Sequence, residues 1–242
     1  MNPTRLIIDA RSGSDGNEIP AKTSWLTGFV ICTFALLMVG CDTVGGSRSS
    51  FGPIYQPSNI YRSTLTMPPQ VRRVAVLPVT CQARDWEADA GRPEVEPILH
   101  GELSKTKVFE VVTVTPEQLL AWSGRSGWRA DEALPVDFFE RARKSTGCDA
   151  VLFAHLRPFH AYRPMSVGWN LKLVETHARG VLWAADEVFD ASQPAVIRAA
   201  EQYWDGHHDG SRPSAEAEAI LNSPRRFSQY TLSALLATLP QR

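Results

Sequence analysis

The stretch that decides the fold is "VRRVAVLPV", residues 71–79. Val74 to Leu77 form a short, uninterrupted apolar run that ends at Pro78. A strand that is apolar at consecutive positions is buried on both faces, as are the inner strands of an α/β sheet. We therefore predict that a folded domain begins at Val71 and extends to Arg242, with helices on both sides of its sheet.

Helices and further strands alternate after this first strand. An apolar stripe at Ile98, Leu99 and Leu103 predicts a helix that packs by one side. Strands separated by helices of this length form parallel, right-handed crossovers. The predicted elements are a helix with Pro97 in its first turn, a strand at 107–114, a short helix opened by a capping box at Thr115, a helix over 135–146 ended by Gly147, and a strand at 148–156.

The pattern changes at "VGWNLKLVE", residues 167–175, where apolar residues alternate with Gly168, Asn170 and Lys172. Such alternation is typical of a strand with one wet face. Residues 181–190 read as its antiparallel partner, and helices follow from Pro194 and Pro224. The predicted fold is α/β: a single three-layer domain with a mixed sheet of about five strands, in which parallel βαβ units precede an antiparallel hairpin and C-terminal helices.

Residues 41–70, before the domain, are rich in Ser, Gly and Pro and show no helical or strand periodicity. This composition predicts a flexible tether. Residues 1–40 read as an export signal, because Trp25 to Val39 form an uncharged core of signal-peptide length after Lys22. A membrane span needs about 20 apolar residues, which is more than this core offers.

The residues Met38, Val39, Gly40 and Cys41 resemble the bacterial lipobox, with Met where Leu is usual. The resemblance implies cleavage between Gly40 and Cys41 and a diacylglycerol on the cysteine, which makes the membrane a partner of the N-terminus. Several acyl chains hold a protein on a bilayer almost permanently. An incidental thiol is the alternative. Asp42 resembles a signal for retention at the inner rather than the outer membrane.

Composition and motifs exclude several kinds of chemistry. The 25 Lys and Arg balance the 26 Asp and Glu, so no basic field predicts nucleic-acid binding. The P-loop, GxGxxG, GxSxG, HExxH and CxxC motifs are all missing from the sequence. We predict no catalytic, cofactor-binding or metal-binding residues; "HHDG", residues 207–210, stays open as a metal-binding alternative.

Two carboxylates, two thiols and one histidine have ordinary structural explanations. Asp186 and Glu187 are consecutive on a predicted strand, so they should point to opposite faces. Cys81 and Cys148 lie at opposite edges of the predicted parallel sheet, which predicts two free thiols. His155 falls in a buried strand, where a hydrogen-bonded histidine is commoner than a catalytic base.

Six of the seven tryptophans follow Cys41, and Trp86, Trp122 and Trp128 lie in or beside predicted loops. If these three rings are exposed, they mark an interaction surface. The alternative is that they cover the core beneath the loops.

The lipobox, the tether and a strand such as "RRVAVLPV" together resemble envelope lipoproteins related to the TolB amino-terminal domain and the curli-secretion lipoproteins. "LKLVETHARGVLWAADEVFD", residues 171–190, is similar to the hairpin of such proteins, with Glu175 in place of their usual Asp. The resemblance implies a non-enzymatic periplasmic adaptor or assembly subunit, with envelope proteins or further copies of itself as partners. The alternatives are a periplasmic small-molecule or metal-binding protein and an enzyme with an unrecognised site.

Overall fold

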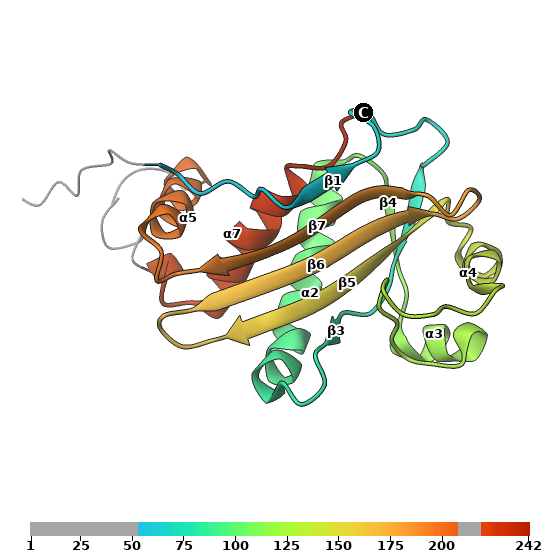
Figure 1. Ribbon diagram of the computed structural model, residues 1–242, viewed down its shortest axis with the longest axis horizontal. Helices are drawn as coiled ribbons and strands as arrows, with labels where there is room; N and C mark the ends of the chain where they lie inside the picture. Colours follow the sequence, from blue (N-terminus) through green and yellow to red (C-terminus); the bar gives the residue numbers. More distant parts are fainter. Residues whose placement is uncertain (1–52, 208–218) are drawn as a thin grey trace, which may run out of the picture. The chain divides into compact units, whose positions relative to one another are not determined.

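The computed structural model describes residues 53–207 and 219–242. In this part of the chain, seven strands form one mixed sheet and five helices pack on it (Figure 1). The strand order is β1-β7-β6-β5-β2-β4, and the short β3 pairs with β5. The predicted α/β domain with a mixed sheet is confirmed.

All five predicted strands are present. β2 lies between β4 and β5 and runs parallel to both, and its Val74, Ala75 and Val76 are fully buried. β5, β6 and β7 form an antiparallel meander. Their bounds are Arg73–Val76 for β2, Glu110–Thr113 for β4, Ala150–His160 for β5, Ser166–Glu175 for β6 and Val181–Asp190 for β7.

The two additional strands are β1 (Ile60–Arg62) and β3 (Thr80–Cys81). With three and two residues, they are too short to show a period-2 pattern. β1 pairs antiparallel with β7, and β3 pairs parallel with the carboxyl half of β5. They widen the sheet beyond the five strands expected.

Two helices cover the back face of the sheet, α2 (Trp86–Thr106) and α7 (Pro224–Leu236), and α5 (Pro194–His207) packs against α7. Figure 1 shows α2 and α7 crossing behind β5 to β7. Trp169 and Trp183 are fully buried between the sheet and α7. Their indole N–H groups donate to the hydroxyls of Thr231 (3.1 Å) and Thr238 (3.0 Å), which satisfies donors that burial removes from water.

Two short helices, α3 (Pro116–Ser123) and α4 (Phe138–Thr146), lie on the front face. The predicted capping box at Thr115 is present, and Gly147 ends α4 with a φ of 67°. Both helices pack over Leu77 and Phe153 in a second apolar cluster. The sheet therefore lies between two layers of helix, as predicted.

The helix α2 starts at Trp86 rather than at the predicted Pro97, since Asp85 caps it by accepting from the Ala88 N–H (3.0 Å). The helix continues through internal prolines, each of which removes a backbone donor. Packing compensates: Gly91 lies so close to β5 that a Cβ there would be 2.3 Å from the Phe159 ring. The prediction that Pro97 lies in the first turn of this helix is therefore wrong, because Pro97 lies inside it.

Part of the predicted tether belongs to the folded domain. Tyr55 packs edge-on against Phe189, β1 joins the sheet, and Met67 is 4% exposed. The Met67 N–H donates to the Gln241 carbonyl (2.8 Å), which ties this segment to the C-terminal end of the chain. Such isolated contacts leave no periodic signal in the sequence, so the boundary expected at Val71 moves to about Pro53.

Candidate binding surface

Half of the front face of the sheet has no helix over it among the residues that the structure describes. In the described part of the chain, α3 and α4 cover β2 and the amino half of β5 on this face, while no helix packs over most of β6 and β7 there. Tyr61 (54% exposed) and Val188 (43% exposed) are apolar members of this surface. We call the following residues the open face: Tyr61, Asn170, Lys172, Ala184, Asp186 and Val188.

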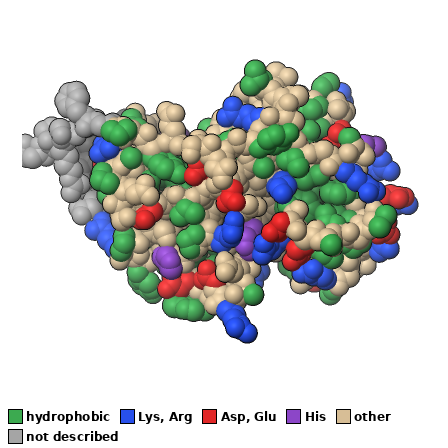
Figure 2. All heavy atoms as spheres, in the orientation of Figure 1, with side chains coloured by type: hydrophobic (Ala, Val, Ile, Leu, Met, Phe, Trp, Pro, Cys, Tyr) green, Lys and Arg blue, Asp and Glu red, His purple; other side chains and the backbone are tan. Residues whose placement is uncertain are grey.

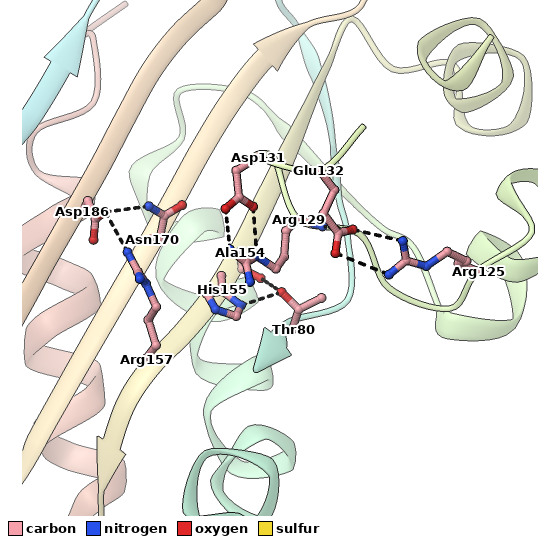
Figure 3. A network of polar contacts seen from close by, with 10 residues as sticks. All are labelled: Thr80, Arg125, Arg129, Asp131, Glu132, Ala154, His155, Arg157, Asn170 and Asp186. Carbon is pink, nitrogen blue, oxygen red and sulfur yellow. Dashed lines mark hydrogen bonds and ion pairs between the residues drawn. The ribbon is translucent and has the colours of Figure 1, made fainter. Parts of the chain in front are cut away.

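A row of polar residues crosses the front of the sheet from strand to strand (Figure 3). Directly paired residues project on the same side of a sheet, so strand register alone brings them together. Figure 2 shows acidic, basic and histidine side chains gathered near the middle of this face. The row consists of Thr80 in β3, His155 in β5, Asn170 in β6 and Asp186 in β7.

His155 is held by a hydrogen bond to Thr80. The Thr80 hydroxyl donates to the Ala154 carbonyl (3.2 Å), so it accepts from the His155 Nδ1–H at 2.9 Å. The Nε2 atom is buried and has no hydrogen-bond partner among the described residues. Burial, and then the positive charges of Arg129 and Arg157, lower the pKa of His155. The prediction of a buried, hydrogen-bonded histidine is confirmed.

Asp186 closes the row at β7. Its Oδ2 accepts from Asn170 Nδ2 (2.8 Å) and from the Arg157 guanidinium (3.1 Å). Glu187, the next residue, points to the back face and is 9% exposed. The two carboxylates thus lie on opposite faces, as their consecutive positions predicted, and they cannot flank one substrate bond.

Glu187 fixes the segment through which the chain enters the sheet. It accepts from the backbone N–H groups of Ser58 and Asn59 (2.9 Å for Asn59) and from the Tyr55 hydroxyl (2.8 Å). Burial works to raise the pKa of Glu187, but these hydrogen bonds outweigh it and hold the pKa below its ordinary value. An ionised carboxylate therefore fastens the segment before β1 to the edge of the sheet.

Of the three tryptophans that would mark an interaction surface if exposed, two pack on the core. Trp128 is 6% exposed and donates to Ser123 Oγ (2.8 Å). Trp122 is half-buried, with its ring centroid 5.1 Å from that of Phe138. Trp86, at the start of α2, is 71% exposed. The core-covering alternative therefore holds for Trp122 and Trp128, and Trp86 remains a candidate contact residue.

The loop between α3 and α4 is held by charge pairs beside the polar row. Arg125 stacks over the Trp128 ring (4.2 Å) and pairs with Glu132 (3.2 Å). Arg129 pairs with Asp131, with Nε 2.9 Å from Oδ1. That hydrogen bond lowers the pKa of Asp131. The charges next to His155 are therefore already matched within the domain.

Trp86 stands between two open hollows of about 600 and 610 Å³. Both hollows are lined by residues 82–86. The first hollow also touches the end of the open face at Asp186 and Val188. Arg157 and His160 line it as well, but each is paired with a carboxylate, on Asp186 and Glu87.

The other candidate groups are separated in the structure. His207 ends α5 with its Nδ1 2.7 Å from the Tyr203 carbonyl, and the rest of "HHDG" lies outside the described residues. Cys81 and Cys148 are free, as predicted, and burial raises the pKa of Cys81 to about 11. Within residues 53–207 and 219–242, no group of three His, Cys, Asp or Glu is arranged to hold a metal ion.

The N-terminal predictions fall outside the described residues. They are the signal peptide at 1–40, the cleavage site at Gly40 and the lipidated Cys41. Among the helices that the structure describes, none is long and apolar enough to cross a bilayer.

Neither a protein-family model nor a curated protein matches this chain. Some solved structures are distantly similar to it. The PelC dodecamer from Paraburkholderia phytofirmans is 13% identical, covers 76% of this chain and 98% of its own, and has a TM-score of 0.43. Lipoprotein GNA1162 from Neisseria meningitidis is 13% identical, with 62% and 94% covered and a TM-score of 0.33. These similarities are too distant to assign the chain to a family, and the TolB-like resemblance remains a prediction.

The polar row could not be predicted from the sequence. The alternation in β6 indicated that Asn170 and Lys172 face away from the core. It did not reveal which residues of β3, β5 and β7 lie beside them, because register depends on a bulge between Leu156 and Phe159.

Proposed function

We propose that this chain is a lipid-anchored, non-enzymatic adaptor or assembly subunit of a bacterial envelope complex, and that a partner protein binds its open face. The observation that supports this most is that, among the described residues, helices cover one side of the sheet and only half of the other. A bare half-face with Tyr61, Val188 and Lys172 offers aromatic, apolar and charged contacts. The membrane then supplies the location and the open face supplies the contact.

A small-molecule-binding protein is the main alternative, because the hollow beside Trp86 has a volume typical of ligand pockets. Its lining argues against that function. Arg157 and Asp186 pair with each other at 3.1 Å, and His160 pairs with Glu87 at 2.9 Å. A ligand would have to break these pairs before it could use them, whereas a protein partner can bury the pairs intact.

Catalysis has little support in the same region. It needs polar groups held within hydrogen-bond reach around a concave site. His155 is hydrogen-bonded to Thr80 with its Nε2 buried away from solvent, and Asp131 and Asp186 are each paired with an arginine. We therefore infer that the charged residues of this face stabilise the fold and contact a partner.

The anchor is tested by replacing Cys41. Cys41→Ala should leave the membrane fraction or accumulate as an uncleaved precursor, because the acyl chains supply nearly all of the membrane affinity. The measurement is fractionation together with intact mass, and Cys81→Ala is the matched control, since it removes a thiol without touching the lipobox. Unchanged mass and fractionation for Cys41→Ala would contradict the lipoprotein assignment and leave Cys41 as an incidental thiol.

The contact surface is tested by capture of partners from solubilised host membranes. Tyr61→Ala combined with Lys172→Ala removes two open-face side chains with little effect on the core. Leu120→Ala combined with Val136→Ala is the control, because Leu120 and Val136 are exposed (52% and 85%) outside the open face. We expect the first pair to lower capture at least tenfold and the control to leave it unchanged, at equal melting temperatures. Equal capture by both variants would contradict an open-face interface.

A further inference from the structure

Two of the most exposed aromatic side chains in the described part of the chain lie at one corner of the domain. Trp86 is 71% exposed at the start of α2, and Tyr162 is 79% exposed in the turn between β5 and β6. His160 Nδ1 contacts Glu87 at 2.9 Å and so links the β5 end of this turn to the first turn of α2. We call Trp86 and Tyr162 the aromatic corner.

The chain enters the domain at the same end of the sheet. Ala191, directly after β7, donates to the Met165 carbonyl of the β5–β6 turn (2.8 Å). Four residues later, the Ala195 carbonyl accepts from the Tyr55 N–H (3.2 Å), and Arg198 donates to the Pro53 carbonyl (2.7 Å). Contacts within the fold therefore place Pro53 and the turn that carries Tyr162 at the same end of the strands.

The segment between the proposed anchor and the domain is short. From Cys41 to Pro53 is a step of 12 residues, which spans at most about 40 Å when fully extended. A random coil of that length has a root-mean-square extent of roughly 20 Å. The end of the domain that carries Pro53 is thus confined near the bilayer, whereas the opposite strand ends lie roughly 30 Å from that end along the strands, at 3.3 Å per residue, and can reach further from the bilayer.

We infer that the aromatic corner rests on the surface of the anchoring bilayer, with Trp86 and Tyr162 at the level of the lipid headgroups. This inference rests on the proposed lipid anchor. Trp and Tyr are the side chains that favour this depth, because an apolar ring and a polar N–H or O–H suit the two sides of the interface. The corner then orients the domain on the membrane and leaves the open face directed along the bilayer toward a partner.

A spin label tests this inference in the lipidated full chain. The protein carries Cys81→Ala and one new cysteine, either Tyr162→Cys or Val136→Cys; Cys148 stays, because it is fully buried. Val136 is the matched control. It is 85% exposed, and its carbonyl accepts from Arg179 in the β6–β7 turn, at the far end of the strands. Both proteins are reconstituted into phosphatidylethanolamine–phosphatidylglycerol vesicles.

Flotation with the vesicles shows whether the protein is anchored. Relaxation of the spin label by a water-soluble nickel chelate shows whether the labelled site is in contact with the bilayer. We expect both proteins to float, with the label at position 162 at least threefold less accessible to nickel than the label at 136. Adding Trp86→Ser should restore most of that accessibility without changing flotation.

Three results would overturn the inference. Failure to float would remove the anchor and this inference together. Flotation with equal accessibility at positions 162 and 136 would overturn the bilayer contact alone. Protection of the label at 162 that needs added membrane proteins, and is missing in pure lipid, would assign the aromatic corner to a protein partner instead.

Discussion

At the residue scale, Glu187 shows how one buried carboxylate determines where the chain enters the sheet. Hydrogen bonds from Ser58, Asn59 and Tyr55 converge on it from a segment without sequence periodicity. A buried acceptor that holds several donors costs more to remove than any one bond contributes, because the donors are left without partners. Asp186, the neighbouring carboxylate, is half-exposed on the opposite face and has water as an alternative partner.

Replacing these two neighbouring carboxylates should therefore give unequal effects. We expect Glu187→Ala to lower the free energy of unfolding by about 2 to 3 kcal/mol, and Asp186→Ala by less than about 1 kcal/mol. Chemical denaturation of both variants at pH 7 is the measurement. A larger loss for Asp186→Ala would mean that the segment before β1 is held in some other way.

The lowered pKa of Glu187 also predicts how the stability of the protein changes at acid pH. The pKa of Glu187 is lowered in the folded state, so its contribution to stability is complete above the unfolded value of about 4.3 and is lost as pH falls through the folded value. The difference in unfolding free energy between wild type and Glu187→Gln should stay constant from pH 7 to pH 5 and narrow below about pH 4. A difference that grows toward acid pH would contradict the lowered pKa.

At the element scale, α2 shows tertiary packing overriding a local signal. The helix contains Pro93 and Pro97, and its Gly91 approaches β5 so closely that a Cβ would be 2.3 Å from the Phe159 ring. The same helix contains Gly101, where a Cβ would have no neighbour within 4 Å. One helix therefore carries a glycine that packing requires and one that it does not.

These two glycines make a matched pair. We expect Gly91→Ala to lower the free energy of unfolding by about 2 kcal/mol or more, since either the ring or the helix must shift. Gly101→Ala should raise it by roughly 0.5 to 1 kcal/mol, because alanine is the better helix former and loses less backbone entropy on folding. Thermal and chemical unfolding of both variants give the comparison, and equal effects would mean that α2 does not pack on β5 through Gly91.

At the scale of the whole molecule, the domain is closed by contacts between distant parts of the chain. Residues 53–70 contribute β1, the Tyr55 hydroxyl and the buried Met67, whose N–H bonds the Gln241 carbonyl. The Arg242 guanidinium in turn donates to the carbonyls of Val71 and Val108, both at 2.7 Å. The two ends of the described chain therefore stabilise each other beside the edges of the sheet.

The contribution of these contacts to stability can be measured with truncated fragments. From the sequence alone, the fragment 71–242 is expected to fold by itself. The contacts of residues 53–70 now predict that a fragment starting at Pro53 is more stable than one starting at Val71 by roughly 3 kcal/mol, about the value of one buried Met side chain together with lost strand hydrogen bonds. Urea denaturation of the two fragments tests this, and equal midpoints would show that the segment only lies on the surface.

The sequence by itself determined the class of fold and the main elements. Consecutive apolar residues at 74–77 specified a doubly buried strand, alternation at 167–173 specified a strand with one wet face, and Thr115 and Gly147 marked the ends of helices. These signals are local: each depends on the chemistry of a few neighbouring residues and on the period of one element. The N-terminal export signal and lipobox rest on the same kind of local pattern.

Only the tertiary structure decided which residues meet. Strand register placed Thr80, His155, Asn170 and Asp186 in one row, and packing of Trp122 and Trp128 against the core left Trp86 as the exposed member of the three. Register, burial and the open half of the sheet arise from contacts between residues dozens of positions apart. No local period encodes such contacts, because their energy depends on how whole elements pack against one another.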